Sequence, residues 1–350
     1  MTRQGVICAL AATLLLPGCA VRYVVGAAYH QAELLLAREP IEEVLTDGRV
    51  SVGQEQRLRL IGELKTYGKQ IGLASTDNYA AVSLDWNRTI WNVSACDPLS
   101  FTPRTWWFPI VGRVPYLGYF TDTAAQRQLD ALAADGLDVY KRTAGAYSTL
   151  GWFRDPVLPS MLRWDEPDLA ETVFHELAHA TLWVPGSVSF NESFASVVGE
   201  QAARRWLQDR YGPDSAELAE FDREDRDWRR FEAILHGVYR DLDAVYGDPT
   251  LDEARRLEKK AATLASLPDR VRGSDIEAVE RYVRVATRSP WNNARLMQFK
   301  AYNSNDSLFA TILERHPGDL QGFIDEIGTI TRGRRDPFVA LSEAVAVKNP

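Results

Sequence analysis

The segment His175-Glu176-Leu177-Ala178-His179 constrains this 350-residue chain more than any other feature. The chain has only five histidines, so the number of H-E-x-x-H strings expected by chance is about 0.004. On a helix, two histidines four residues apart lie about 40° apart around the axis and about 6 Å apart along it, so both imidazoles can bind one ion. Glu176 can accept a proton from a water bound to that ion. The motif therefore predicts a catalytic zinc site with one Zn²⁺ per chain.

The residues around the motif favour a helix. Asp165 or Glu166 can cap its N-terminus, and Pro167 stands where the first-turn N–H would be unpaired in any case. Pro185-Gly186 ends the helix at the latest. An apolar stripe flanks the histidines and consists of Leu169, Val173, Phe174, Leu177 and Leu182. We therefore expect both histidines to project from one helical face.

A catalytic zinc site has three protein ligands and one open position, so a third donor must come from another element. We expect this donor to be Glu192, near the start of a second helix that runs to about Tyr211. Two alternatives stay open. Ser189 and Glu192 could instead form an S-x-x-E capping box, which satisfies backbone N–H groups without a metal. Glu200, two helical turns further along, is the competing ligand.

These two segments carry a resemblance to known proteins. The motif at 175–179, followed by Asn191-Glu192-Ser193-Phe194-Ala195, resembles the gluzincin metallopeptidases, whose third ligand is a glutamate in an N-E-x-x-A helix. One departure is the connection at 180–191, which is shorter than in well-studied gluzincins. Residues 19–350 also resemble the bacterial aminopeptidase lipoprotein family, and the stretches that carry this likeness are 107–116, 146–151, 174–179 and 190–195.

The resemblance implies a gluzincin-like, two-lobed α+β fold. A lobe with a mixed or antiparallel sheet would be followed by a helical lobe, with the zinc helix at the cleft between them. The resemblance also implies a zinc metallopeptidase that acts on peptides, as an aminopeptidase. A zinc endopeptidase is the close alternative. A non-catalytic envelope lipoprotein that uses the fold as a binding or assembly module is another.

Peptide hydrolysis at such a site needs groups beyond the metal ligands. Glu176 is expected to take a proton from the zinc-bound water and deliver it to the leaving amine. A donor must stabilise the oxyanion, and Tyr147 and Tyr302 are the candidates. Tyr147 is chosen because it precedes the zinc motif where gluzincins place a substrate-binding edge strand. An aminopeptidase also needs a carboxylate for the substrate's free amine, and Asp155 and Glu200 are possible without either being favoured.

The first twenty residues predict the compartment. Arg3 and the apolar run at 6–16 form a signal that is too short to span a bilayer. Leu16-Pro17-Gly18-Cys19 resembles a bacterial lipobox, so residues 1–18 are predicted to be a lipoprotein signal peptide and Cys19 the lipidated residue. Ala20 suggests, by resemblance, an outer-membrane anchor facing the periplasm. An ordinary secretory signal is the alternative.

Composition excludes some other functions. The formal net charge is −8, and nucleic-acid binding needs a basic field that this chain lacks. Once Cys8 is removed and Cys19 is acylated, Cys96 remains alone, and we expect it to be a small buried apolar residue. The three histidines outside the motif are expected to be ordinary surface or core residues; they are His30, His236 and His316.

The pattern along the chain predicts an α+β region at 19–165, the zinc-site helices at 166–212 and a helical region at 213–350. Helices are expected at 32–37, 41–45, 55–71 and 122–134. One hairpin is expected from 82–84 and 89–93, a second from 106–110 and 114–120, and further strands at 137–141 and 146–153. The late helices are expected at 216–246, 251–267, 275–287, 293–303 and 309–313.

Overall fold

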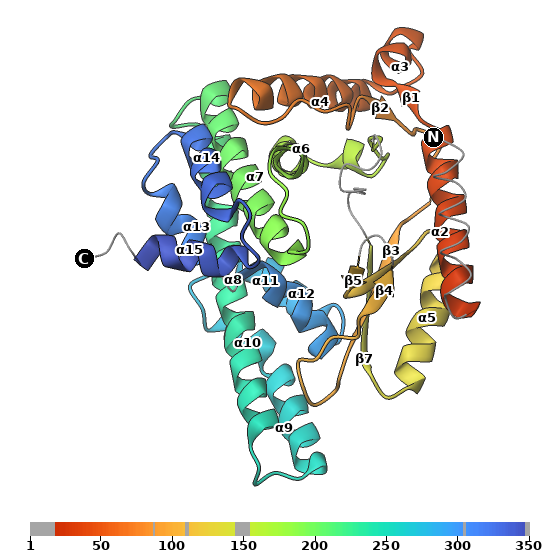
Figure 1. Cartoon of the computed structure of the whole chain (residues 1–350), viewed down its shortest axis with the longest axis vertical. Helices are drawn as coiled ribbons and strands as arrows, with labels where there is room; N and C mark the ends of the chain where they lie inside the picture. The colour runs from red at the N-terminus through yellow and green to blue at the C-terminus, as the bar shows by residue number, and fades with distance from the viewer. Residues whose placement is uncertain (1–17, 87, 109–111, 144–154, 304–305, 347–350) are drawn as a thin grey trace.

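The computed structural model describes residues 18–86, 88–108, 112–143, 155–303 and 306–346. It is an α+β fold in which 63% of the residues are helical and the sheets are small and antiparallel. Helices surround the centre on three sides, and most of the strands lie between helices that flank them on both sides (Figure 1). The expected α+β class is therefore confirmed.

Three helices begin the described chain. They are α2 (Gly18–Leu36), α3 (Ile41–Asp47) and α4 (Val52–Gln70). Ser51 caps α4 in a complete capping box, with Gln54 reaching back to the Ser51 backbone. The apolar face of α4 packs on the zinc-motif helix, where Gly68 leaves room for the side chain of Leu177. Residue Cys19 lies in the first turn of α2, which starts well before the helix expected at 32–37.

The main sheet has three strands, in the order β6 (Tyr116–Tyr119), β3 (Trp91–Cys96) and β7 (Asp138–Thr143). Both outer strands run antiparallel to β3. Helix α5 (Asp122–Ala134) covers one face, with Val93, Ala95 and Leu132 buried between them. Helix α12 (Asn293–Asn303) contacts β3 and β7. Gly136, at φ +80°, takes the left-handed turn after α5 that an L side chain rarely adopts.

One of the two expected hairpins is wrong. β2 (Ala81–Val82) pairs with β1 (Glu39–Pro40), whereas β3 pairs with β6 and β7, so the described segments around 82 and 91 do not pair with each other. The second is only partly right: β4 (Trp106–Phe108) pairs with β5 (Gly112–Val114), but most of the expected strand at 114–120 is β6, which pairs with β3 instead. The strand expected at 146–153 falls outside the described residues.

The zinc-motif helix is α6 (Glu166–Thr181), followed by α7 (Val188–Tyr211). Asp165 caps α6 by accepting a hydrogen bond from the Asp168 N–H at 2.9 Å. Ser187 is the N-cap residue of α7 and makes no side-chain cap bond, so the alternative capping box of Ser189 and Glu192 is not formed. Glu192 is thereby free of that structural role.

The remaining helices complete two apolar clusters. Around the first, α13 (Asp306–Leu313), α14 (Leu320–Thr331) and α15 (Pro337–Ala346) pack on the start of α7, where Phe190 contacts Phe309 and Phe338. The second cluster joins α12 to α8 (Ala216–Gly247), α10 (Leu267–Arg272) and α11 (Val279–Thr287), and α9 (Glu253–Ala265) contacts α8 and α10. Helices α10, α14 and α15 were not among the expected segments. In the described part of the chain, no helix combines the length and apolarity that crossing a membrane requires.

Candidate metal centre

Three side chains converge where α6 crosses α7. Glu192 Oε2 lies 3.6 Å from His175 Nε2, and Glu192 Oε1 lies 3.6 Å from His179 Nε2. The donor atoms of all three residues lie within 4.8 Å of one another. Two ligand atoms bound about 2.0–2.1 Å from a tetrahedral zinc ion would be roughly 3.3 Å apart. This group could therefore hold a metal ion with only small side-chain movements.

Close helix packing brings the three residues together. A Cβ atom on Gly199 of α7 would meet the Glu171 carbonyl oxygen of α6 at 2.9 Å and the His175 Cβ at 3.1 Å. Only glycine allows this approach. The short connection between the helices is held by Asn191, whose buried amide accepts from the Val184 N–H at 2.8 Å and donates to the Val184 carbonyl at 2.9 Å. The shorter spacing of the motif is thus accommodated by a compact turn.

The charges at the site favour cation binding. Burial and the neighbouring His175 lower the pKa of His179 to about 4, so its ring is neutral near pH 7 and offers a lone pair. Burial alone would raise the pKa of Glu192, but the histidines and Arg142 hold it below its ordinary value. Burial alone would lower the pKa of His175, whereas Glu192 and Glu176 raise it. A carboxylate and two imidazoles are the donor types of a catalytic zinc site.

The second ring nitrogen of His179, Nδ1, is buried and has no hydrogen-bond partner among the described residues. Metal-bound histidines usually donate this other N–H to a carboxylate, a carbonyl or a water. The nearby side chain of Asn191 is hydrogen-bonded to the backbone of Val184 instead. An imidazole with Nε2 aimed at the cluster is nevertheless the arrangement that a metal ion needs.

Glu176 is half-buried beside the histidines on α6. A fully buried tyrosine that the sequence reasoning missed, Tyr79, lies close enough for the Glu176 charge to matter. Burial raises the pKa of Tyr79 well above its ordinary value, and the charges of Glu176 and Asp155 raise it further. Tyr79 adopts φ 59°, and its N–H donates to the Asp155 carbonyl at 2.8 Å. Its hydroxyl has no hydrogen-bond partner in the described residues.

Asp155 and Glu200, the two acids considered for binding the substrate's amine, are not part of the metal-binding group that the described residues form. Glu200 pairs with Arg229 at 2.6 Å and stays outside the metal-binding group, so the described structure brings Glu192 and not Glu200 to the histidines. Asp155 is 2% exposed, and its N–H donates to the side chain of Asn78. Glu171 lies one turn before His175 on α6; burial and the Glu200 charge raise its pKa to about 7.

Two sheet residues also belong to the surroundings of Glu192, and the sequence gave no reason to select them. Arg142 of β7 lowers the pKa of Glu192, although burial and the histidines act on it more strongly. Burial raises the pKa of Tyr116 on β6, and Glu192 raises it further. The alternating pattern at 138–143 could have marked Arg142 as sharing a face with Asp138 and Tyr140. The strand pairing places Arg142 on the same face as Tyr116, and this face contacts α12, which in turn contacts α7.

The side chains of the two predicted oxyanion donors lie outside the described part of the structure. Tyr147 lies outside the described residues. Tyr302 lies near the end of α12, and its side chain is also outside them. Cys96 is buried as expected, and burial raises the pKa of its thiol to about 12.

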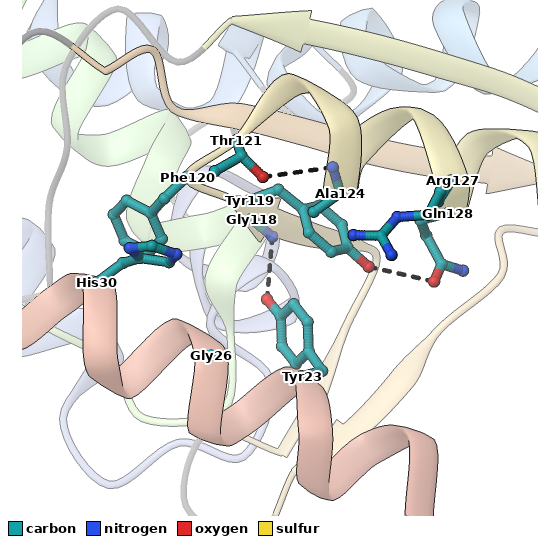
Figure 2. A pocket seen from close by; sticks show the side chains of 10 residues that line it. All are labelled: Tyr23, Gly26, His30, Gly118, Tyr119, Phe120, Thr121, Ala124, Arg127 and Gln128. Carbon is teal, nitrogen blue, oxygen red and sulfur yellow. Dashed lines mark hydrogen bonds between the residues drawn. The ribbon is translucent and has the colours of Figure 1, made fainter.

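A cavity of about 360 Å³ lies elsewhere, between α2, β6 and α5, and no metal-binding residue lines it (Figure 2). Its walls are tied together: the Gly118 N–H donates to the Tyr23 hydroxyl at 3.1 Å, and Tyr119 donates to Gln128 at 3.2 Å. Burial raises the pKa of Tyr23 to about 12. Tyr23 therefore docks α2 on the edge of the sheet one turn after Cys19.

The fold and this site define an α+β protein in which three residues on two packed helices could hold a metal ion. A sequence model of the family described as "Putative aminopeptidase" matches residues 22–336. The chain therefore belongs to this aminopeptidase family, which implies a peptidase acting on peptides. The same comparisons found no matching curated protein and no matching solved structure.

Proposed function

We propose that this protein is a zinc-dependent aminopeptidase of the bacterial cell envelope, with a gluzincin-type site. The observation that carries the proposal is the convergence of His175, His179 and Glu192, whose donor atoms lie within 4.8 Å of one another. Family membership supports the peptidase activity. The donor set supports zinc, since imidazole nitrogen and carboxylate oxygen are its usual catalytic ligands.

When bound, a zinc ion would polarise the scissile carbonyl and lower the pKa of a water to about 7. Glu176 performs the proton transfers. Its carboxylate takes the proton from the attacking water and delivers it to the nitrogen of the leaving amine. Because Glu176 follows His175 directly on α6, it stands at the edge of the metal group without being a ligand.

A hydrogen-bond donor would stabilise the oxyanion of the tetrahedral intermediate. Tyr147 and Tyr302 stay our candidates for this role. Tyr116 joins them, because it is a described tyrosine whose hydroxyl senses the charge of Glu192. Replacing each with Phe separates them: the donor's variant loses turnover with both small and large substrates, and the others keep it.

The envelope location rests on the lipobox. We propose that residues 1–18 are removed and that Cys19 carries the lipid anchor, which probes of acylation and a Cys19→Ser variant would test. Tyr23 holds α2 on the sheet one turn later. An anchor at Cys19 would therefore hold the sheet edge at β6 near the membrane surface, facing the periplasm if the anchor is in the outer membrane.

The deciding experiment measures zinc content and turnover for the chain from Ala20 and for its Glu176→Gln variant. Substrates are aminoacyl reporter amides and an N-terminally blocked peptide. We expect one zinc per chain in both proteins and cleavage of unblocked substrates by the parent alone. Cleavage of the blocked peptide would indicate an endopeptidase. Zinc binding without any cleavage would contradict the enzymatic proposal and favour a binding or assembly module.

A further inference from the structure

Arg142, a cation near the metal group, has no ion-pair partner among the residues that the structure describes. The Nε atom of Arg142 is buried without a hydrogen bond, and no ion pair among the described residues involves this guanidinium. Its neighbour on β7 is different, because Lys141 pairs with Asp122 at 2.8 Å and with Gln126 at 2.7 Å on α5. The two adjacent residues point to opposite faces of the strand.

The strand register fixes the face on which Arg142 lies. Arg142 is paired with Asn92, while Ser94 is paired with Tyr140 on one side and Tyr116 on the other. Residues directly opposite each other in antiparallel strands point to the same face, and so do residues two apart. Arg142 therefore shares a face with Tyr116, away from α5.

This face turns toward the helices that carry the metal ligands. Gln298 of α12 donates to Ser94 at 3.2 Å, and the guanidinium of Arg295 lies 5.7 Å from the ring of Tyr140. The same helix contacts α7. In Figure 1, α12 lies between the lower end of α7 and the strands. Arg142, near the end of β7, thus reaches into the surroundings of Glu192, as its effect on that carboxylate also indicates.

The net positive charge at this position favours the binding of an anion. A divalent ion held by two neutral imidazoles and the Glu192 carboxylate has a net charge of +1, which the ionised Glu176 carboxylate offsets, so Arg142 leaves one positive charge beside the group. An unpaired charge taken out of water is costly unless a partner compensates it. Arginine is suited to one partner above others, because its planar fork binds a carboxylate through two parallel hydrogen bonds.

We infer that Arg142 binds a carboxylate of the peptide substrate. The inference rests on the proposed peptidase function and makes Arg142 a specificity-determining residue of that site. The carboxylate can come from two sources, the free C-terminus of a short peptide or an acidic side chain close to the scissile bond. In either case, the preferred substrates are short or acidic peptides.

The test measures binding, so that it does not depend on turnover. The zinc-loaded chain carrying Glu176→Gln is titrated calorimetrically with trialanine, with trialanine amide, and with the amide whose middle residue is aspartate. A hydrogen-bonded charge pair is worth about 1.5–3 kcal/mol, so we expect at least one carboxylate peptide to bind about 10-fold or more tightly than trialanine amide. Adding Arg142→Gln should reduce that preference to nearly none.

Three controls make the result specific. Lys141→Gln, one residue away on the other face, should keep the preference in full. Arg142→Lys keeps the charge without the fork and should retain part of it. Zinc content and circular dichroism of each variant exclude a folding defect. The peptide whose preference depends on Arg142 identifies the source of the carboxylate.

Equal affinity for the acids and the amide, or a preference that survives Arg142→Gln, would overturn the inference. So would turnover in which Arg142→Gln lowers kcat alike for acid and amide, since that would make the arginine an oxyanion donor. These results leave the proposed function intact. Loss of zinc binding by the parent, or no cleavage of any peptide, would instead overturn the proposed function itself.

Discussion

Two buried charged clusters in this molecule are built on opposite principles. In the first, Lys260 of α9 donates to Asp138 at 2.5 Å and to the Pro98 carbonyl at 2.9 Å, and Asp138 also accepts from the Asn293 N–H at 2.8 Å. These bonds tie the sheet to α9 and α12. The second cluster consists of the metal-binding residues with Arg142, and buried nitrogen atoms of His179 and Arg142 lack partners there.

We interpret the cluster around Lys260 as one that stabilises the fold, and the cluster around Glu192 as one that binds a ligand. Buried polar groups in proteins are nearly always hydrogen-bonded, so each exception calls for an explanation. The cluster around Lys260 is complete by itself and needs nothing from solution. The cluster around Glu192 has donor atoms that lie close together, and its arginine, Arg142, forms no ion pair within the described part of the chain. We expect substitutions in the first cluster to change stability, and those in the second to change binding.

The largest effect should follow removal of a metal ligand. His179→Ala takes away one of three donors, and the zinc affinity should fall by more than the roughly 10- to 100-fold loss typical of outer partners. Competition with a chromophoric chelator measures it. If His179→Ala kept the parent's affinity, the two clusters would not differ as described.

Breaking the cluster around Lys260 should lower the stability of the fold and leave zinc binding unchanged. Lys260→Met leaves the Asp138 carboxylate buried without its cation, and such a change costs about 3–5 kcal/mol. Urea denaturation of the chain measures the loss. The folded protein should bind zinc as the parent does; weakened zinc binding would show that the two clusters are coupled.

The helix contact beneath the metal ligands offers a sharper test. A Cβ at Gly199 would come within 2.9 Å of a backbone oxygen on α6, so Gly199→Ala should force α6 and α7 apart and cost about 1–3 kcal/mol. Zinc affinity should fall as well, because His175 and Glu192 would separate. Gly62→Ala is the matched control: its Cβ meets nothing within 4 Å, and helix propensity predicts a gain of about 0.5–1 kcal/mol.

The smallest effect concerns a second structural cluster and depends on pH. Burial alone would raise the pKa of Glu326, but His316 and Arg315 hold it below its ordinary value. A lowered pKa means that ionised Glu326 stabilises the fold above its unfolded pKa, and that this stability is lost as pH falls through the folded pKa. Glu326→Gln should therefore flatten the acid side of the stability curve by about 1 kcal/mol or less. Denaturant titrations between pH 3 and about pH 7 compare the two proteins, and a curve unchanged by the substitution would contradict the pairing.

Local signals predicted some elements closely. Helix α5 was expected at 122–134 and occupies those residues, because Thr121 caps its start and Gly136 provides the turn after its end. Helix α12 also matches its expected range. The convergence of His175, His179 and Glu192 could be predicted because two of them lie on one helix and the third lies near the start of the next.

Non-local features were beyond the sequence. The segments around 82 and 91 alternate like a hairpin, yet each pairs with a strand from elsewhere in the chain. Arg142 was missed for the same reason: its position beside Glu192 depends on which strands flank β3, and no local pattern encodes that. The close helix contact at Gly199 likewise appears only when α6 and α7 are packed together.

The central claim is that His175, His179 and Glu192 hold a zinc ion. The X-ray absorption spectrum of the zinc-loaded chain tests it most directly, with the Glu192→Gln variant for comparison. The account predicts two imidazole nitrogens and oxygen ligands at about 2.0–2.1 Å, with the variant binding less zinc. A sulfur ligand, a shell without imidazole scattering, or a spectrum and zinc content unchanged by Glu192→Gln would contradict it.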